Sequence, residues 1–199
     1  MIRTLMRRFG VTLAAVITLG ISSSALSAQA KQLQIERFDA QISVAESGRV
    51  YVSESILFRF TGSWNGVYRD IPVVYTTPSG FSLHLELNVH SVMAEDGTAR
   101  QYEESRERHY KRIKIWVPGA VNVSRTINIQ YSSPNALRFI DAEESEFDAG
   151  HDELYWNVTG DEWEIPIGAA SARIIVPPEV TGLRARVYTG GLGSTASNA

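Results

Sequence analysis

The chain of 199 residues contains no cysteine. A disulfide framework and a cysteine-ligated metal site are therefore both excluded. The chain also lacks a surplus of basic residues, because 19 Lys and Arg stand against 22 Asp and Glu. This balance argues against a dedicated nucleic-acid-binding protein. Apolar material is plentiful, with 44% hydrophobic and 10% aromatic residues, so the chain can bury a core and disorder over most of its length is not expected.

Familiar catalytic motifs are also missing. The sequence has no Gly-x-Ser-x-Gly nucleophile elbow and no His-Glu-x-x-His pair, and its four histidines lack the spacing of metal ligands. Acids gather between Asp141 and Glu153, but their spacing matches no calcium-binding loop, and we interpret them as a solvated loop. The sequence therefore predicts no catalytic residue, no metal site and no cofactor.

The first thirty residues have the three parts of a secretory signal peptide. Arg3, Arg7 and Arg8 precede an apolar run over residues 9–21, and small and polar residues follow up to Ala30. We predict cleavage after Ala30. An uncleaved anchor is the alternative, although the apolar run is shorter than the roughly 20 residues of a spanning helix. The chain is expected at the extracytoplasmic face of the cytoplasmic membrane, in the periplasm or at the cell surface.

The rest of the chain is dominated by alternating apolar and polar residues, the pattern of half-buried strands. Alternation runs over 38–44, over 50–60 with Glu54 as its one interruption, and over 81–89. Ser47-Gly48 predicts a hairpin between the first two runs, and Asp96-Gly97 is a second hairpin signal. Further strands are predicted at Tyr110–Val117, Thr126–Tyr131, Leu154–Val158, Ala172–Val176 and Arg184–Tyr188, and a short helix within Ala136–Phe147.

Many strands joined by turn residues, without crossover helices, predict an all-β fold. The expected architecture is an antiparallel β-sandwich, immunoglobulin-like in general architecture, with a partly closed β-barrel as the alternative. We assign residues 31–188 to this extracytoplasmic domain. Residues 189–199 form a Gly- and Ser-rich end.

Two segments are unusual in composition. Gly66–Pro72 reads Gly-Val-Tyr-Arg-Asp-Ile-Pro, and Asp152–Trp163 places two tryptophans around a glycine turn. The two segments follow the predicted leader and precede Pro177 and Tyr188–Ser194. In this order they resemble the domain of unknown function 2207 (DUF2207) family of predicted bacterial membrane proteins. The resemblance runs from about Gln34 to the C-terminus.

The resemblance implies an exported N-terminal β domain followed by membrane-spanning helices, and it brings no established catalytic residue. This chain departs from that plan because no spanning segment follows the domain. A fragment of a longer protein is favoured over a soluble version, so the expected partner is the membrane, reached through a segment missing from this chain. An envelope protein or polysaccharide is the second expected partner, and nucleic acid is not expected.

The same two segments supply the candidate binding residues, which are Tyr68, Arg69, Asp70, Glu153, Trp156 and Trp163. Arg69 and Asp70 are adjacent, so on a strand they point to opposite faces and do not pair with each other. Arg69 is expected to meet another carboxylate, for example one within Glu153–Glu162. Trp156 shares its register with Leu154 and is expected in the core. Trp163 and Trp64 lie nearer turns, where exposure is the expectation.

These observations favour a non-catalytic extracytoplasmic module of a membrane-associated protein that contacts a protein or an envelope polymer. Two alternatives stay open. One is an enzyme acting on an envelope glycan with a carboxylate pair near Trp156 and Trp163. The other is a structural spacer for membrane helices.

Overall fold

The computed structural model describes residues 30–76, 82–143, 145, 149–189, 196 and 197. The predicted leader, except Ala30, and most of the Gly- and Ser-rich end therefore lie outside the described residues. All the regular elements of the described part are β-strands. Within these ranges, no helix has the length and apolar character needed to cross a bilayer.

Six strands form the main sheet, in the order β10-β1-β2-β7-β5, with β6 also paired to β7. Their bounds are β1 Gln32–Val44, β2 Val50–Pro72, β5 Asn88–Ala94, β6 Tyr102–Glu107, β7 Tyr110–Ser133 and β10 Ala170–Ile175. Neighbouring strands are antiparallel except for β1 and β10, which are parallel. The predicted hairpin at Ser47-Gly48 is confirmed, because β1 and β2 pair as far as Val44↔Val50.

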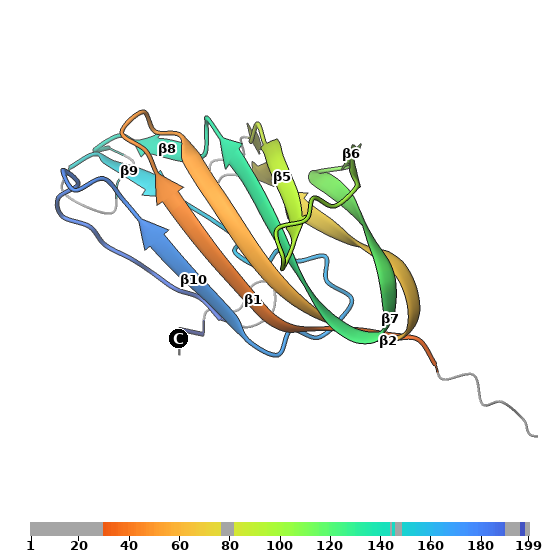
Figure 1. The fold of residues 1–199 in the computed structure, drawn as a ribbon. Coiled ribbons are helices and arrows are strands. Elements are labelled where there is room, and N and C mark those ends of the chain that lie inside the picture. Colours follow the sequence, from red (N-terminus) through yellow and green to blue (C-terminus); the bar gives the residue numbers. More distant parts are fainter. Residues whose placement is uncertain (1–29, 77–81, 144, 146–148, 190–195, 198–199) are drawn as a thin grey trace, which may run out of the picture.

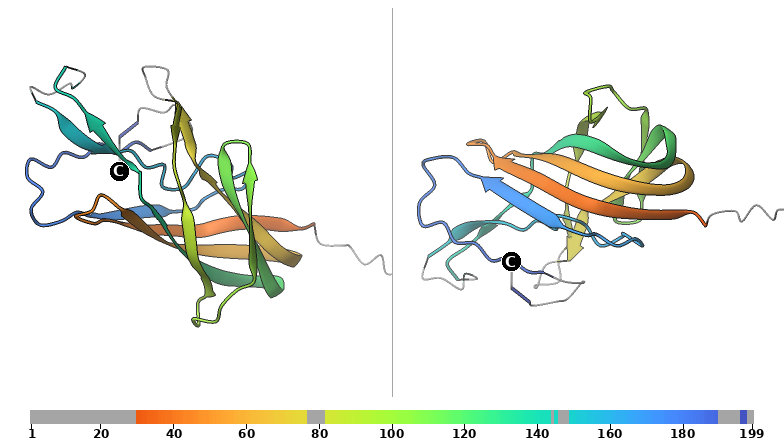
Figure 2. Two further views of the ribbon diagram at one scale, coloured as in Figure 1. Left: turned by 90° about the horizontal axis from the view of Figure 1, so that it is seen from above. Right: turned by 60° about the horizontal axis from the view of Figure 1, so that its bottom comes forward.

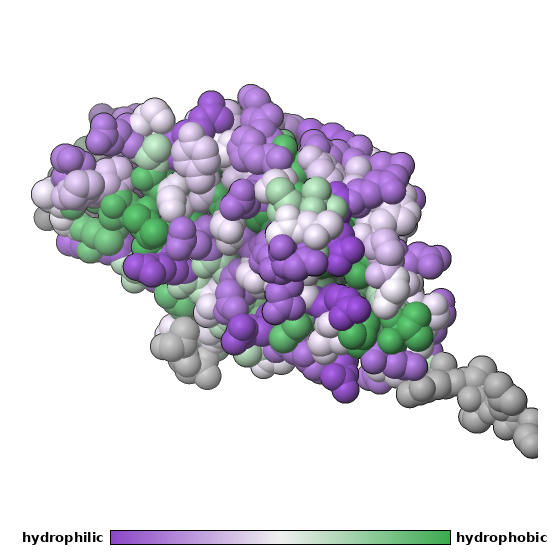
Figure 3. Space-filling view, viewed as in Figure 1, coloured by the Kyte–Doolittle hydropathy of each residue, from purple (hydrophilic) through white to green (hydrophobic). Residues whose placement is uncertain are grey.

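A second layer covers one face of this sheet (Figures 1 and 2). It consists of two small hairpins and the irregular segment 155–169. The hairpins are β3 Val74–Thr76 with β4 Ser82–His84, and β8 Leu137–Ile140 with β9 His151–Leu154. The prediction of an all-β, layered fold is confirmed. The opposite face of the main sheet is mostly hydrophilic (Figure 3).

The core lies between the two layers and follows the alternation in the sequence. On β2, the residues Val52, Ile56, Phe58 and Phe60 are at most 3% exposed. Their counterparts on β7 are Ile127, Ile129 and Tyr131, each at most 1% exposed. Because side chains on a strand alternate between faces, one polar residue in such a row is buried with its apolar neighbours. Glu54, at 0% exposure, is that residue on β2.

β2 and β7 are long strands that curve together and turn back (Figure 1). Their pairing is interrupted between Phe60 and Ser63 and between Trp64 and Gly66. The turn, which we call the bend, comprises residues 61–66 and 117–122. Positive φ angles at Gly62, Gly119 and Asn122 accommodate it, and the Gly62 N–H donates to Asn122 Oδ1 across 2.7 Å. Beyond the bend, residues 66–72 and 110–116, flanked by β6, form a second sheet portion that we call the arm.

Several predicted strands have different bounds. The runs 110–117 and 126–131 belong to the single strand β7, and Pro118 lies inside it rather than between strands. The β2–β7 register skips residues 117–119, so Pro118 sits where no ladder donor is required. The run 81–89 is divided instead. Its described part contributes β4 to one sheet and the start of β5 to another, with Leu85 and Leu87 buried between them.

Other corrections concern the C-terminal half. Among the described residues of 136–147, β8 replaces the predicted short helix. The strand predicted at Leu154–Val158 ends at Leu154. No strand forms over residues 184–188, where every side chain is exposed. The alternation there is real, but a strand also needs a neighbouring backbone to complete its hydrogen bonds. By contrast, the strand predicted at 172–176 is confirmed as β10, which begins two residues earlier, at Ala170, and ends one residue earlier, at Ile175.

Candidate functional site

Arg69 on β2 is enclosed in the core and forms a two-pronged ion pair with Glu54 of the same strand. Arg69 Nε donates to Glu54 Oε2 at 2.8 Å and Arg69 Nη2 donates to Glu54 Oε1 at 2.7 Å. The two residues are 1% and 0% exposed. β2 brings them together because the bend turns its second half back over its first. Burial by itself would lower the pKa of Arg69, but the charge and hydrogen bonds of Glu54 raise it above its ordinary value.

Tyr131 of β7 completes this group, which we call the Arg69 cluster. The Tyr131 hydroxyl donates to Glu54 Oε1 at 2.6 Å, so the carboxylate receives three hydrogen bonds in an apolar surrounding. Burial, and after it the negative charge of Glu54, raise the pKa of Tyr131 well above its ordinary value. A carboxylate satisfied in this way is a structural anchor, because its oxygens are already occupied by protein donors.

The Arg69 cluster also holds the second-layer segment that carries the Trp-rich motif. Arg69 Nη1 donates to the carbonyls of Thr159 and Asp70, both at 2.9 Å, and Arg69 Nη2 to the carbonyl of Val158 at 3.4 Å. Gly160 follows with φ +83°, and a Cβ there would lie 2.7 Å from Arg69 Nη1. A glycine is therefore required at this position for both backbone conformation and space.

The two tryptophans of the motif pack around this anchor. The Trp163 indole donates from Nε1 to the Thr159 carbonyl at 2.7 Å, and its ring lies 5.7 Å from the Arg69 guanidinium carbon. The Trp156 ring stacks on Tyr131, with centroids 6.2 Å apart. Both tryptophans are partly buried against the core. Trp156 is thus where its register predicts, while Trp163 is more enclosed than its place near a turn suggests.

The structure therefore brings the two sequence motifs together, but not through the predicted contact. The carboxylate partner of Arg69 is Glu54, and the segment 158–159 contributes backbone carbonyls instead of an acid. Glu153 forms an ion pair with Arg138 on the β8–β9 hairpin, at 2.8 Å. Sequence reasoning missed Glu54 and Tyr131 as partners. The available signal was Glu54 itself, because a charged residue in a buried apolar row needs an opposite charge.

Tyr68 and Asp70 point away from this interior. Tyr68 lies on the outer surface of the arm, and Asp70 lies beside Arg112 with its side chain 9% exposed. Asp70 receives hydrogen bonds from Arg112 Nε at 2.8 Å and Arg112 Nη2 at 2.7 Å. The Arg112 guanidinium carbon lies 5.1 Å from the centre of the Tyr68 ring. Tyr68 is 53% exposed. Adjacent residues on a strand thus separate into a buried role for Arg69 and surface roles for its two neighbours, as the alternation of a strand requires.

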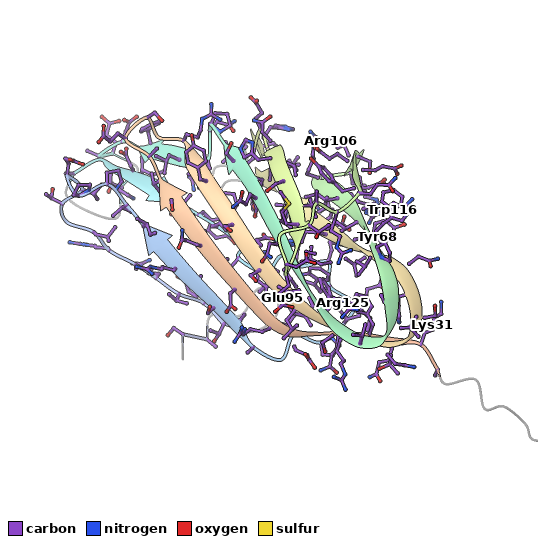
Figure 4. All side chains as sticks on the ribbon, viewed as in Figure 1. Lys31, Tyr68, Glu95, Arg106, Trp116 and Arg125 are labelled. Atoms are coloured by element: carbon purple, nitrogen blue, oxygen red, sulfur yellow. The ribbon has the colours of Figure 1, made fainter. Side chains whose placement is uncertain are left out.

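Trp116 and Lys114 of β7 extend the same surface. Lys114 is the register partner of Tyr68, and Trp116 is the register partner of Gly66. Lys114 Nζ lies 4.5 Å from the Trp116 ring centre and 3.7 Å from Glu103. A side chain at residue 66 is excluded, since its Cβ would lie 2.1 Å from the Ile115 carbonyl oxygen. Figure 4 shows Tyr68 and Trp116 projecting near each other from the arm.

We call Tyr68, Asp70, Arg112, Lys114 and Trp116 the arm face. Two aromatic rings beside two cations and a carboxylate provide stacking surfaces together with hydrogen-bond donors. Such a set is suited to recognition by contact, of a sugar ring or of a protein side chain. In the described part of the chain, no group of three or more His, Asp or Glu side chains is arranged to hold a metal ion.

Comparison with known families places this arrangement in a sequence context. The family model described as the N-terminal domain of a predicted membrane protein (DUF2207) matches residues 34–199. The match includes both segments that contribute to the Arg69 cluster and both strands of the arm face. A comparison with curated proteins finds no match.

Solved structures resemble the fold at low identity. Yeast leukotriene A4 hydrolase in complex with bestatin matches with a TM-score of 0.51 and 14% identity, over 79% of this chain and 26% of the hydrolase. The native enzyme from Saccharomyces cerevisiae matches with a TM-score of 0.50 at the same identity and coverage. An M1 zinc metallopeptidase from Deinococcus radiodurans, as the E323A mutant bound to Tyr-Ser-Ala, has a TM-score of 0.45 at 12% identity, over 73% of this chain and 33% of that one. The chain thus spans about a quarter of the yeast hydrolase it matches, and the likeness concerns the fold alone.

Proposed function

The chain belongs to the family of the N-terminal domain of predicted membrane proteins (DUF2207), and on this basis we propose that it is a non-catalytic recognition module. It acts outside the cytoplasm as part of a membrane-associated protein and contacts a protein or an envelope polymer through the arm face. The observation that carries the proposal is the exposure of Tyr68, at 53%, beside the paired Arg112 and Asp70.

The geometry of this surface supports a contact role. The Asp70–Arg112 pair fixes the guanidinium over one side of the Tyr68 ring, so the ring is held in place before a partner arrives. A rigid aromatic side chain loses little conformational entropy on binding, and aromatic and arginine residues dominate the energetics of interfaces. Trp116 adds a second ring on the same side of the arm.

Two of the acids near the tryptophans, Glu54 and Glu153, are not available for glycan hydrolysis. A glycosidase requires two carboxylates facing each other across the scissile bond. Glu54 is enclosed and satisfied by Arg69 and Tyr131, and Glu153 is engaged by Arg138. Neither carboxylate is therefore placed to donate a proton to a glycosidic oxygen.

Site-specific photocrosslinking in intact cells tests the proposal. A benzophenone amino acid is placed at Tyr68 in the full-length chain, and in a matched variant at Phe139, which is 77% exposed on β8. We expect an adduct with a protein or a polysaccharide from position 68 and little from position 139. Trp116→Ala should reduce the adduct from position 68 about tenfold, the effect of removing one aromatic anchor. Equal adducts from both positions would contradict the proposal.

A further inference from the structure

The bend is the end of the molecule at which the chain enters the fold. β1 begins at Gln32, and the chain preceding it reaches the fold beside the bend (Figure 1). Lys31 contacts the bend directly, since its Cγ lies 3.2 Å from the position of a Cβ on Gly62. The described N-terminal residues, Ala30 and Lys31, therefore lie at this end of the molecule.

The surface around this point combines cations with apolar groups. We call it the bend surface. It comprises Lys31, Arg59, Trp64 and Val121, together with Arg125, which follows the bend on β7 and is the register partner of Phe58. Lys31 Nζ lies 5.7 Å from the Trp64 ring centre, and the Trp64 indole N–H donates to the Thr61 carbonyl at 2.8 Å. Val121 stands at the turn with 52% exposure. Trp64 is partly buried against the core, with its ring centre 6.4 Å from that of Phe60, so it is more enclosed than its place near a turn suggests. Its outer part, beside cations and the exposed Val121, has the composition of groups that sit at a lipid–water boundary.

The cations of the bend surface are weakly neutralised. Glu36 Oε1 is 3.9 Å from Arg59 Nη1, a long ion pair. Of the described carboxylates, none lies within 4.0 Å of a side-chain nitrogen of Lys31 or Arg125. Glu95, exposed after β5, is the acid labelled near Arg125 in Figure 4, in keeping with the register pair Ala94↔Ile127.

Charge is also segregated along the molecule. Residues 108–131 contain Arg108, Lys111, Arg112, Lys114 and Arg125 and no acid, and this stretch includes most of β7. Residues 141–153 contain seven acids and no lysine or arginine. Its described acids, Asp141, Glu143, Asp152 and Glu153, lie in or beside the β8–β9 hairpin, which is at the end of the molecule opposite the bend (Figures 1 and 2). Three of the cations in residues 108–131 are paired, Lys111 with Glu104, Arg112 with Asp70 and Lys114 with Glu103. The cations left to attract a negatively charged plane near the bend are therefore Lys31 and Arg125.

We infer that the bend surface lies against a bilayer and binds anionic lipid headgroups, with Lys31 and Arg125 at the phosphates and Val121 and Trp64 at the acyl boundary. The inference uses the membership in a family of membrane proteins and does not depend on the arm face. It assigns the module one orientation, with the acidic β8–β9 hairpin directed away from the bilayer. Leader cleavage after Ala30 would strengthen the contact, because the new α-amino group would belong to Lys31.

The absence of cysteine makes this orientation measurable with single labels. The full-length chain carries a nitroxide at Val121→Cys or, as the matched control, at Phe139→Cys in β8, where the native side chain is also exposed. Each protein is mixed with vesicles of phosphatidylcholine alone or with added phosphatidylglycerol. With the anionic vesicles, we expect the label at residue 121 to become accessible to oxygen and protected from a polar relaxation agent. The label at residue 139 should stay in water.

Charge variants test the headgroup contact. A cation near an anionic surface contributes about a fivefold increase in binding, so Lys31→Gln with Arg125→Gln should weaken partitioning onto phosphatidylglycerol vesicles about thirtyfold. Arg173→Gln, on the exposed strand β10, is the matched control and should change partitioning less than twofold. Equal immersion of the labels at residues 121 and 139 would overturn the inference. So would a loss of partitioning in Arg173→Gln as large as that in the double variant. So would binding to soluble polyglutamate with both labels left in water, which would identify an acidic polymer as the partner. Failure of the photocrosslinks from Tyr68, with vesicle binding as expected, would contradict the proposed recognition function and leave the membrane contact supported.

Discussion

Replacing Arg69 by methionine should destabilise the protein strongly, although it removes no residue from the surface. The substitution leaves Glu54 at 0% exposure with the Tyr131 hydroxyl as its remaining side-chain donor. Removing one partner of a buried ion pair costs about 3–5 kcal/mol. The Thr159 carbonyl also loses its bond to Arg69, although Trp163 still donates to it. We therefore expect a loss of at least about 4 kcal/mol, a large part of the roughly 5–15 kcal/mol of a typical domain.

Urea unfolding followed by circular dichroism and tryptophan fluorescence measures this loss. Arg112→Met is the comparison variant, because it breaks an equally well-formed arginine–carboxylate pair in which Arg112 is 35% exposed and Asp70 is 9% exposed. That change should cost about 1–2 kcal/mol, because water can replace the arginine at a carboxylate near the surface. A loss below about 1.5 kcal/mol for Arg69→Met, or equal losses for the two variants, would refute the reasoning from burial.

The double variant Glu54→Gln/Arg69→Met separates the ion pair from the backbone contacts. It removes the unpaired charge, so about 1–3 kcal/mol of the loss should be recovered as coupling between the two sites. Recovery should remain incomplete, because the carbonyls of Val158 and Asp70 still lack the Arg69 donor. Full recovery would show that Arg69 contributes nothing to holding the second layer.

Two further predictions concern the same cluster. Gly160→Ala should lower the free energy of unfolding by about 2 kcal/mol more than Gly97→Ala does. Both glycines have φ near +80°, but a Cβ at residue 160 would lie 2.7 Å from Arg69 Nη1, while nothing lies within 4 Å of a Cβ at residue 97. Equal losses in urea unfolding would argue against this close approach. The raised pKa of Tyr131 keeps it neutral in the folded state while the unfolded tyrosine ionises near pH 10, so its contribution to stability is complete below that pH and is lost above it, by about 1.4 kcal/mol per pH unit. Tyr131→Phe should flatten the alkaline fall in unfolding free energy by about that slope, and an unchanged slope would contradict the assignment.

Local pattern was a good guide where the structure depends on alternation. The pairing of β1 with β2 followed from two apolar rows and a Ser-Gly turn, and the opposite directions of Arg69 and Asp70 followed from their adjacency on one strand. The same reasoning failed at residues 81–89 and 110–131. An alternating run does not determine whether all its residues pair within one sheet. A proline can lie inside a strand where a bulge removes the need for a backbone N–H donor.

The amino-acid sequence by itself determined that this protein is all-β, which face of β1 and of the first half of β2 is buried, and which family the chain belongs to. These properties depend on the period of side chains along a strand and on two short motifs. Only the tertiary structure decided that Glu54 is the partner of Arg69, and that carbonyls 90 residues away complete its hydrogen bonds. A buried charge dictates that a partner exists, but the bend in β2 and the path of residues 155–169 select which one comes within reach.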